Sequence, residues 1–122
     1  MPPRVLITDD NAFMRLILRH LLEKHEYTVI GEAGDGHQAV EFYREWQPDL
    51  TFMDINMPGI SGIEAVKEII RFDPEARIVM VSAMGQKYFI RDALNAGAKD
   101  FVIKPFQPEQ VLAVAARVLG TK

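Results

Sequence analysis

Cysteine is absent from this sequence of 122 residues, which excludes a disulfide, a thiolate zinc site and a cysteine nucleophile. Long apolar runs are missing as well. The run at residues 78–81 is far shorter than the roughly 20 residues that a membrane-spanning helix needs. No basic start followed by an apolar stretch suggests a signal peptide, because residues 1–4 lead straight into a strand-like segment. These absences predict a cytoplasmic protein with no membrane segment.

A basic excess is also lacking, since the formal net charge is −3. A nucleic-acid-binding domain is expected to carry a basic patch or stripe, so direct nucleic-acid binding is not expected. The length suits one domain that can bury most of its apolar surface. No linker, internal repeat or low-complexity tract interrupts the chain. We therefore expect a single domain over residues 1–122, without an appended output domain.

Strand-like and helix-like segments alternate along the chain. The strand-like segments are rich in β-branched and apolar residues and lie at 4–8, 28–33, 50–54, 77–81 and 99–103. After each of them, apolar residues recur at helical spacing, with helices expected to begin near Asn11, Gly36, Ile63, Gln86 and Pro108. The alternation predicts an α/β fold with a parallel sheet and helices on both faces. A doubly wound, flavodoxin-like (βα)5 sheet with strand order 2-1-3-4-5 is expected, an order taken from known proteins of this length.

Acidic side chains stand where two of these strands end. Asp9 and Asp10 follow the first strand, and Asp54 closes the third. Each has an ordinary alternative reading, because Asp54 precedes a Pro-Gly loop and could form a turn, and either Asp10 or Asn11 could cap the first helix. In the expected order strands one and three are neighbours, so the three carboxylates should meet at the carboxyl end of the sheet.

Three carboxylates in one crevice repel one another, and a divalent cation relieves that repulsion. Mg²⁺ suits oxygen ligands of this kind and commonly binds through one or two carboxylates plus phosphate. Ser82 ends the fourth strand and Lys104 the fifth, which adds a hydroxyl and an ammonium group to the same edge. Acids, a hydroxyl and a cation around a metal ion suit phosphoryl transfer, in which an aspartate such as Asp54 can act as the nucleophile.

Taken together, these motifs resemble the receiver domain of two-component response regulators over the whole chain. The ordered set that carries the resemblance is Asp9-Asp10, Asp54, Met57-Pro58-Gly59 with Gly62, Ser82-Ala83 and Lys104-Pro105-Phe106. The resemblance implies that a histidine kinase phosphorylates Asp54, that Asp9 and Asp10 help to hold Mg²⁺, and that the Asn56 backbone carbonyl is a further ligand. It also implies that Ser82 and Lys104 contact phosphoryl oxygens and that the bond from Lys104 to Pro105 is cis.

The same resemblance implies a conformational switch. Ser82 would move toward the phosphoryl group and Phe101 would turn inward behind it, while Asn56 and Met84 would tune how long the phosphoryl group lasts. The expected output face includes Ile90, Leu94 and Phe101. A narrower similarity, in residues 82–86 and 97–101, is to single-domain chemotaxis regulators of the CheY type. It implies a flagellar motor switch protein or a phosphatase as partner, and a monomer that could dimerise once phosphorylated.

Other functions remain open at this point. A receiver fragment of a larger, for example DNA-binding, regulator would have the same sequence features. A flavodoxin-type cofactor carrier shares the fold, but Asp9-Asp10 would repel the phosphate that such a protein binds after strand one. A magnesium-dependent phosphatase would need an additional acid and usually a cap over the site. The chain is expected to be a signalling protein, with self-catalysed phosphotransfer and dephosphorylation only, rather than an enzyme of metabolism.

Overall fold

Five strands and five helices alternate in the computed structural model, which describes residues 1–83 and 87–120. The strands are β1 (Arg4–Thr8), β2 (Thr28–Ala33), β3 (Leu50–Asp54), β4 (Ile78–Ala83) and β5 (Asp100–Lys104). The helices are α1 (Ala12–Lys24), α2 (Gly36–Trp46), α3 (Gly62–Phe72), α4 (Lys87–Ala96) and α5 (Pro108–Val118). All strand pairs are parallel, in the order β2-β1-β3-β4-β5. The predicted flavodoxin-like fold is confirmed.

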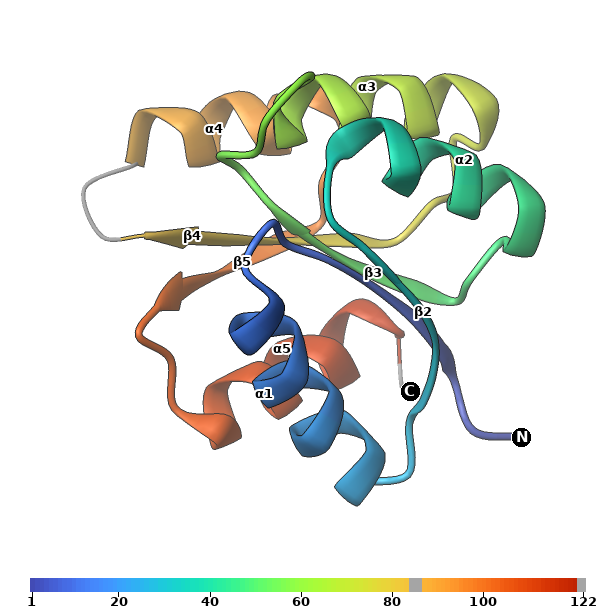
Figure 1. The fold of residues 1–122 in the computed structure, drawn as a ribbon, viewed down its shortest axis with the longest axis vertical. Coiled ribbons are helices and arrows are strands. Elements are labelled where there is room, and N and C mark those ends of the chain that lie inside the picture. Colours follow the sequence, from blue (N-terminus) through green and yellow to red (C-terminus); the bar gives the residue numbers. More distant parts are fainter. Residues whose placement is uncertain (84–86, 121–122) are drawn as a thin grey trace.

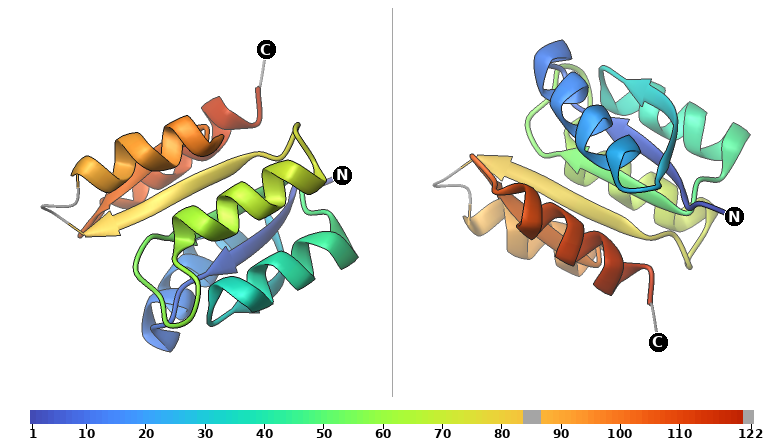
Figure 2. Two further views of the ribbon diagram at one scale, coloured as in Figure 1. Left: turned by 90° about the horizontal axis from the view of Figure 1, so that it is seen from above. Right: turned by 90° about the horizontal axis from the view of Figure 1, so that it is seen from below.

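Helices cover both faces of the sheet. Figure 1 shows α2, α3 and α4 on one side and α1 with α5 on the other, and the two views of Figure 2 look onto these two layers in turn. Two apolar cores result, one under each layer. Alternate residues of one strand enter different cores: Leu6 packs toward α2 and α3, whereas Val5 and Ile7 pack toward α1 and α5. This is why the central strands read as continuous apolar runs.

The structure moves two strand boundaries relative to the sequence-based prediction. β4 was expected over 77–81 and extends to Ala83, and β5 was expected over 99–103 and is shifted by one residue to Asp100–Lys104. The reason is pairing, because the β4–β5 ladder aligns Ser82 with Ile103 and Ala83 with Lys104. Ser82 and Lys104 therefore belong to hydrogen-bonded strands, which hold their backbones more rigidly than a loop would.

Helix N-caps define where the β1–α1 and β2–α2 loops, at the carboxyl end of the sheet, give way to helix. The Asn11 side chain accepts hydrogen bonds from the backbone N–H groups of Phe13 and Met14, at 2.9 and 3.1 Å. Asn11 is thus the N-cap of α1, and the neighbouring Asp10 is not needed for that role. Asp35 caps α2 in the same way through Gln38. Capping by Asn11 leaves the Asp10 carboxylate exposed.

The predicted edge strand, β2, does lie at the edge of the sheet and is covered in part by an aromatic ring. Trp46, at the end of α2, lies so close to Gly31 that a Cβ there would come within 2.5 Å of the ring. The Trp46 ring also stacks on Phe42, with centroids 4.7 Å apart. At the far end of α4, Gly97 adopts φ 126°, the backbone region that favours glycine, as expected for a helix end.

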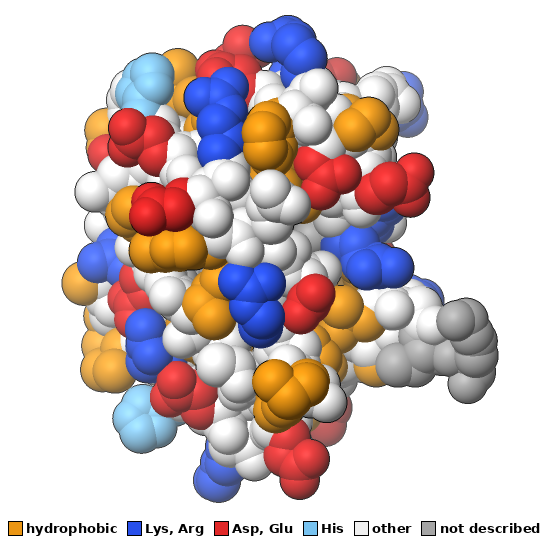
Figure 3. Space-filling model, turned by 90° about the vertical axis from the view of Figure 1, so that its right-hand side faces the viewer, with side chains coloured by type: hydrophobic (Ala, Val, Ile, Leu, Met, Phe, Trp, Pro, Cys, Tyr) orange, Lys and Arg blue, Asp and Glu red, His pale blue; other side chains and the backbone are white. Residues whose placement is uncertain are grey.

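Residues 84–86 lie outside the described part of the chain. The predicted start of the fourth helix at Gln86 and the predicted lifetime-tuning residue Met84 fall in that segment. Within the described residues, no helix is both long and apolar enough to cross a bilayer. On the face drawn in Figure 3, basic and acidic side chains are interspersed, and no continuous basic area is visible there.

Candidate functional site

Asp9 directly follows Thr8, the last residue of β1. Its backbone N–H donates to the Ala33 carbonyl at 3.0 Å, which extends the β1–β2 ladder and leaves Asp9 only 1% exposed. Both of its carboxylate oxygens are engaged: Oδ1 accepts from the Asn11 backbone at 2.9 Å, and Oδ2 accepts from Lys104 Nζ at 2.9 Å. Asp10, the next residue, is exposed. One acid of the pair is therefore held firmly and the other faces solvent.

Asp54 ends β3 beside Asp9, because β1 and β3 pair in register up to Thr8 and Met53. It is 5% exposed. The turn that follows brings α3 back against the strand, and a Cβ at Gly62 would lie 2.0 Å from the Asp54 carbonyl oxygen. Only glycine fits so close an approach, so the Gly62 predicted as part of the loop motif has a steric reason.

Carboxylate oxygens of Asp9, Asp10 and Asp54 all lie within 4.8 Å of one another. Burial and, after it, the negative charge of Asp9 raise the pKa of Asp54 to about 6, although the positive charge of Lys104 partly opposes both. The donor set is hard oxygen only and carries more negative charge than Lys104 can balance. This chemistry fits a magnesium ion, which prefers carboxylate oxygens and water, and the ligand residues would be Asp9, Asp10 and Asp54.

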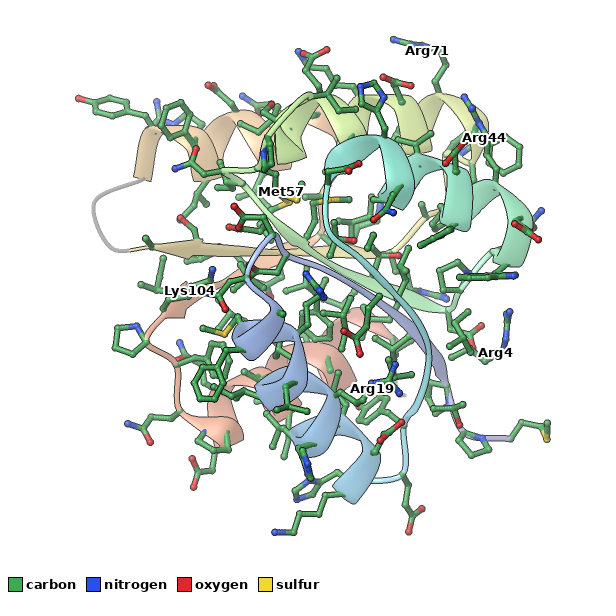
Figure 4. All side chains as sticks on the ribbon, viewed as in Figure 1. Arg4, Arg19, Arg44, Met57, Arg71 and Lys104 are labelled. Carbon is green, nitrogen blue, oxygen red and sulfur yellow. The ribbon has the colours of Figure 1, made fainter. Side chains whose placement is uncertain are left out.

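Lys104 lies on β5, the edge strand that β3 and β4 separate from β1. Its side chain extends from that edge back to the acidic cluster. Its Nζ lies 2.9 Å from Asp9 Oδ2 and 3.7 Å from Asp54 Oδ1. In Figure 4, Lys104 and Met57 of the β3–α3 loop are labelled at the same end of the sheet. The bond from Lys104 to Pro105 is cis, as the resemblance implies.

The remaining predicted residues take different positions. Ser82 is fully buried in β4, one residue beyond Val81, the register partner of Asp54. Its hydroxyl donates to the Ala83 carbonyl at 3.1 Å. Asn56 is exposed, two residues after Asp54 in the loop that leads to α3. Among the described residues, the structure therefore gathers Asp9, Asp10, Asp54 and Lys104 closely and places the other two nearby on neighbouring segments.

Phe101 lies on the surface and not in the core. Its side chain is 37% exposed, and together with Ile90, Leu94 and Ile103 it lines an apolar groove between α4 and β5. The three residues predicted for an output face are thus neighbours in space. The inward orientation that the resemblance implies for the activated form is not the one found here.

The sequence-based prediction missed one residue of this site, Arg15 of α1. Its Nη1 donates to the backbone carbonyl of Asp9 at 2.6 Å. A signal was available, because Arg15, Leu18 and Leu22 follow the spacing of one helix face, and Leu18 and Leu22 are buried. A charged residue on the buried face of a helix needs a polar partner within the protein, so Arg15 could have been expected to bind one.

Comparison with known proteins agrees with this geometry. Residues 5–116 match the family described as the response regulator receiver domain. The chemotaxis protein CheY of Thermotoga maritima is 51% identical over 118 residues, covering 97% of this chain and 98% of the relative. The CheY of Bacillus subtilis is 51% identical over 120 residues, covering 98% and 100%.

Solved structures give the same result. The crystal structure of the CheX-CheY-BeF3-Mg+2 complex from Borrelia burgdorferi superposes with a TM-score of 0.93 at 35% identity, covering 97% of this chain and 90% of that one. The fold, the acidic cluster at the carboxyl end of the sheet and these similarities lead to one assignment. This chain belongs to the response regulator receiver domain family, and its similarity to CheY proteins extends over nearly its whole length.

Proposed function

We propose that this protein is a magnesium-dependent phospho-acceptor switch of a two-component system, of the CheY type, phosphorylated on Asp54 by a histidine kinase. The observation that carries the proposal is the cluster of Asp9, Asp10 and Asp54 within 4.8 Å, with the Lys104 ammonium beside it. Relatives at 51% identity are chemotaxis proteins, which supports a role in chemotaxis and flagellar motor control.

Each residue has a chemical role in this proposal. An Asp54 carboxylate oxygen attacks the phosphorus atom of a phosphohistidine, the phosphorus–nitrogen bond breaks, and the electron pair of that bond stays with the histidine. Magnesium, when bound, neutralises charge on the transferring phosphoryl group. Asp9, Asp10, Asp54 and the Asn56 backbone carbonyl are proposed to hold it. Lys104, held 3.7 Å from Asp54 Oδ1, supplies a second positive charge for the phosphoryl oxygens.

Signal output is proposed to pass through the groove between α4 and β5. Ser82 hydrogen-bonds a phosphoryl oxygen, and Phe101 leaves its exposed position in the groove lined by Ile90 and Leu94. Because Phe101 has no hydroxyl, the changed groove is read by shape. A flagellar motor switch protein or a phosphatase is the proposed partner, and the CheX-CheY complex among similar structures supports signalling through a protein partner.

Further parts of the proposal concern the state of the protein. We place it in the cytoplasm as a monomer, with dimerisation after phosphorylation left as a prediction. Asn56 and Met84 are proposed to tune the phosphoryl lifetime, and the chain is proposed to be a single receiver domain. A receiver fragment of a larger regulator is the alternative, but curated relatives that match almost end to end favour the single domain. A flavodoxin-type carrier is disfavoured by the acids that follow β1.

The decisive experiment is intact-protein mass spectrometry after treatment with acetyl phosphate and Mg²⁺. Wild-type protein should gain the mass of one phosphoryl group, and EDTA should prevent the gain. Asp54→Asn should abolish it, whereas the control Asp49→Asn, an exposed aspartate at the opposite end of β3, should not. Labelling that persists in Asp54→Asn would show that another residue is the nucleophile.

The role of Lys104 is tested separately. Lys104→Ala should still accept a phosphoryl group, because the nucleophile and the acidic cluster remain, but the phosphorylated variant should no longer bind the output partner. The measurement is a pull-down of the labelled protein against motor-switch and phosphatase candidates. Partner binding equal to that of phosphorylated wild type would refute the proposed coupling role.

A further inference from the structure

Arg15 connects three segments that are separate in the sequence. From the first turn of α1 its guanidinium donates through Nη1 to the Asp9 carbonyl at 2.6 Å and through Nε to Glu32 Oε1 at 3.0 Å. Glu32 belongs to β2. The side chain of Arg15 is only 20% exposed, so it joins the helix, the edge strand and the β1–α1 loop from a partly buried position.

Glu32 anchors this arginine. Its second oxygen, Oε2, accepts from Arg19 Nε at 2.6 Å, so one carboxylate binds two arginines that lie one helical turn apart. Burial alone would raise the pKa of Glu32, but the hydrogen bonds from Arg19 and Arg15 outweigh it and hold the pKa below its usual value. Glu32 is therefore ionised at neutral pH. Figure 4 labels Arg19 beside α1, and the two ion pairs tie that helix to β2.

The carbonyl group that Arg15 binds lies between two residues of the acidic cluster. It belongs to the peptide group that joins Asp9 to Asp10, and a peptide group is planar, so its orientation sets the directions in which both residues project. The preceding peptide is already held by the hydrogen bond from Asp9 N–H to Ala33. Within residues 1–83 and 87–120, the following peptide is held through its carbonyl by the hydrogen bond from Arg15. The residues on its two sides are two of the three acids in the cluster.

We infer that Arg15 is a positioning residue, which orients the Asp9–Asp10 peptide group so that both carboxylates face a shared divalent cation. This inference rests on the proposed function, because it assumes that the cluster binds magnesium. Arg15 touches neither the cation nor the phosphoryl group; it acts through the backbone of the loop. Without it, the loop would have to be ordered at the moment of metal binding, and that ordering lowers affinity.

Positioning and simple electrostatics predict changes of opposite sign. Arg15 carries a positive charge near a cation site, so on charge alone its removal should strengthen metal binding. If Arg15 orients the loop, its removal should weaken metal binding despite the favourable charge change. Arg19 provides the matched control, since within the described part of the chain its guanidinium donates to Glu32 and Glu23 and not to residues 9–11.

The experiment measures divalent cation affinity of the full chain, using Mn²⁺ as the probe. Free Mn²⁺ is counted by its electron paramagnetic resonance signal, and Mg²⁺ affinity follows from competition. Arg15→Ala should weaken Mn²⁺ binding about tenfold, whereas Arg19→Ala should leave it unchanged or slightly tighter. Both variants lose an ion pair to Glu32, so their urea midpoints should fall by similar amounts.

Equal or tighter Mn²⁺ binding by Arg15→Ala would overturn the inference while leaving the proposed function intact. Absence of Mn²⁺ binding by the wild-type protein would instead overturn the proposed function itself. Arg15→Lys keeps the charge, but the compact lysine ammonium cannot reproduce the guanidinium, which donates to Glu32 through Nε and to the Asp9 carbonyl through Nη1. It should also bind Mn²⁺ several-fold more weakly, and this variant decides the matter if Arg15→Ala does not fold.

Discussion

The interior of the sheet and its carboxyl end differ sharply over a very short distance. In β1 and β3 the side chains of Leu6, Ile7 and Phe52 are fully buried and apolar. Two residues beyond Ile7 and Phe52, Asp9 and Asp54 are also nearly buried, at 1% and 5% exposure, but they carry charge of the same sign. Burial of apolar side chains in the interior stabilises the fold, whereas burial of like-charged carboxylates at the carboxyl end of the sheet destabilises it.

This difference shows how the two regions depend on each other. Lys104 offers one positive charge to an acidic cluster of three residues, so repulsion remains unless a cation is bound. The apolar interior supplies the stability that keeps these acids together. A functional site of this kind is expected to cost stability, and replacing its residues should then stabilise the protein while destroying activity.

The largest effect is expected in the interior. Phe52→Ala removes a fully buried ring next to the site and should lower the free energy of unfolding by about 3–5 kcal/mol. The control is Phe13→Ala, because Phe13 is 67% exposed and its loss should change stability by less than about 0.5 kcal/mol. Urea unfolding followed by circular dichroism measures both. Similar losses for the two variants would contradict the assigned core.

At the carboxyl end the sign should reverse. Asp54→Asn removes a buried negative charge from beside Asp9 and, in EDTA, should raise the free energy of unfolding by about 2 kcal/mol at neutral pH. Asp10→Asn is the comparison, since the exposed Asp10 should give a smaller gain. Urea unfolding of the metal-free proteins is the measurement. Destabilisation by Asp54→Asn would mean that the acidic cluster stabilises the fold.

The gain from Asp54→Asn should depend on pH. The folded chain binds a proton at Asp54 with a pKa of about 6, whereas the ordinary value is 3.8. Above pH 6 the ionised carboxylate destabilises the folded state, and as the pH falls from about 6 to about 4 the folded state takes up the proton first. Wild-type protein should therefore recover stability relative to Asp54→Asn over that interval. Parallel pH profiles in EDTA would contradict the raised pKa.

Magnesium should act on the same repulsion. At a concentration about ten times its dissociation constant, Mg²⁺ should raise the free energy of unfolding of wild-type protein by about 1.4 kcal/mol. Asp54→Asn should gain clearly less, because it has lost one ligand and one charge. Thermal unfolding with and without Mg²⁺ measures the difference, and Ca²⁺ serves as a second cation. An equal gain in both proteins would place the binding site elsewhere.

The smallest effect is expected at a buried hydroxyl group in the interior. Thr51 is fully buried in β3, and its hydroxyl has no hydrogen-bond partner among the described residues. Thr51→Val keeps the shape of the side chain and removes the unpaired hydroxyl, so the free energy of unfolding should rise by about 1 kcal/mol. Thr28→Val, at an exposed position of β2, should have almost no effect. A loss of stability in Thr51→Val would show that the hydroxyl is bonded in solution.

Prediction from sequence succeeded best where one kind of signal repeats along the chain. The alternation of apolar strands with helical periodicity led to the correct element order, and the family-based strand order proved right. Boundaries at β4 and β5 were wrong by one or two residues, because the β4–β5 pairing decides where those strands end and the residues there are compatible with either assignment. The choice between Asp10 and Asn11 as a cap likewise needed the structure.

Residue types and their order along the chain already define the available chemistry: hard oxygen donors and one ammonium at strand ends, and no thiol at any position. These are properties of residue type and local period, and neither requires knowledge of distant contacts. Three further facts follow from the folded arrangement: Lys104 lies nearer to Asp9 than to Asp54, Phe101 faces the surface, and Arg15 donates to the Asp9 carbonyl. These facts depend on strand register and side-chain orientation, which arise from packing between segments far apart in the chain.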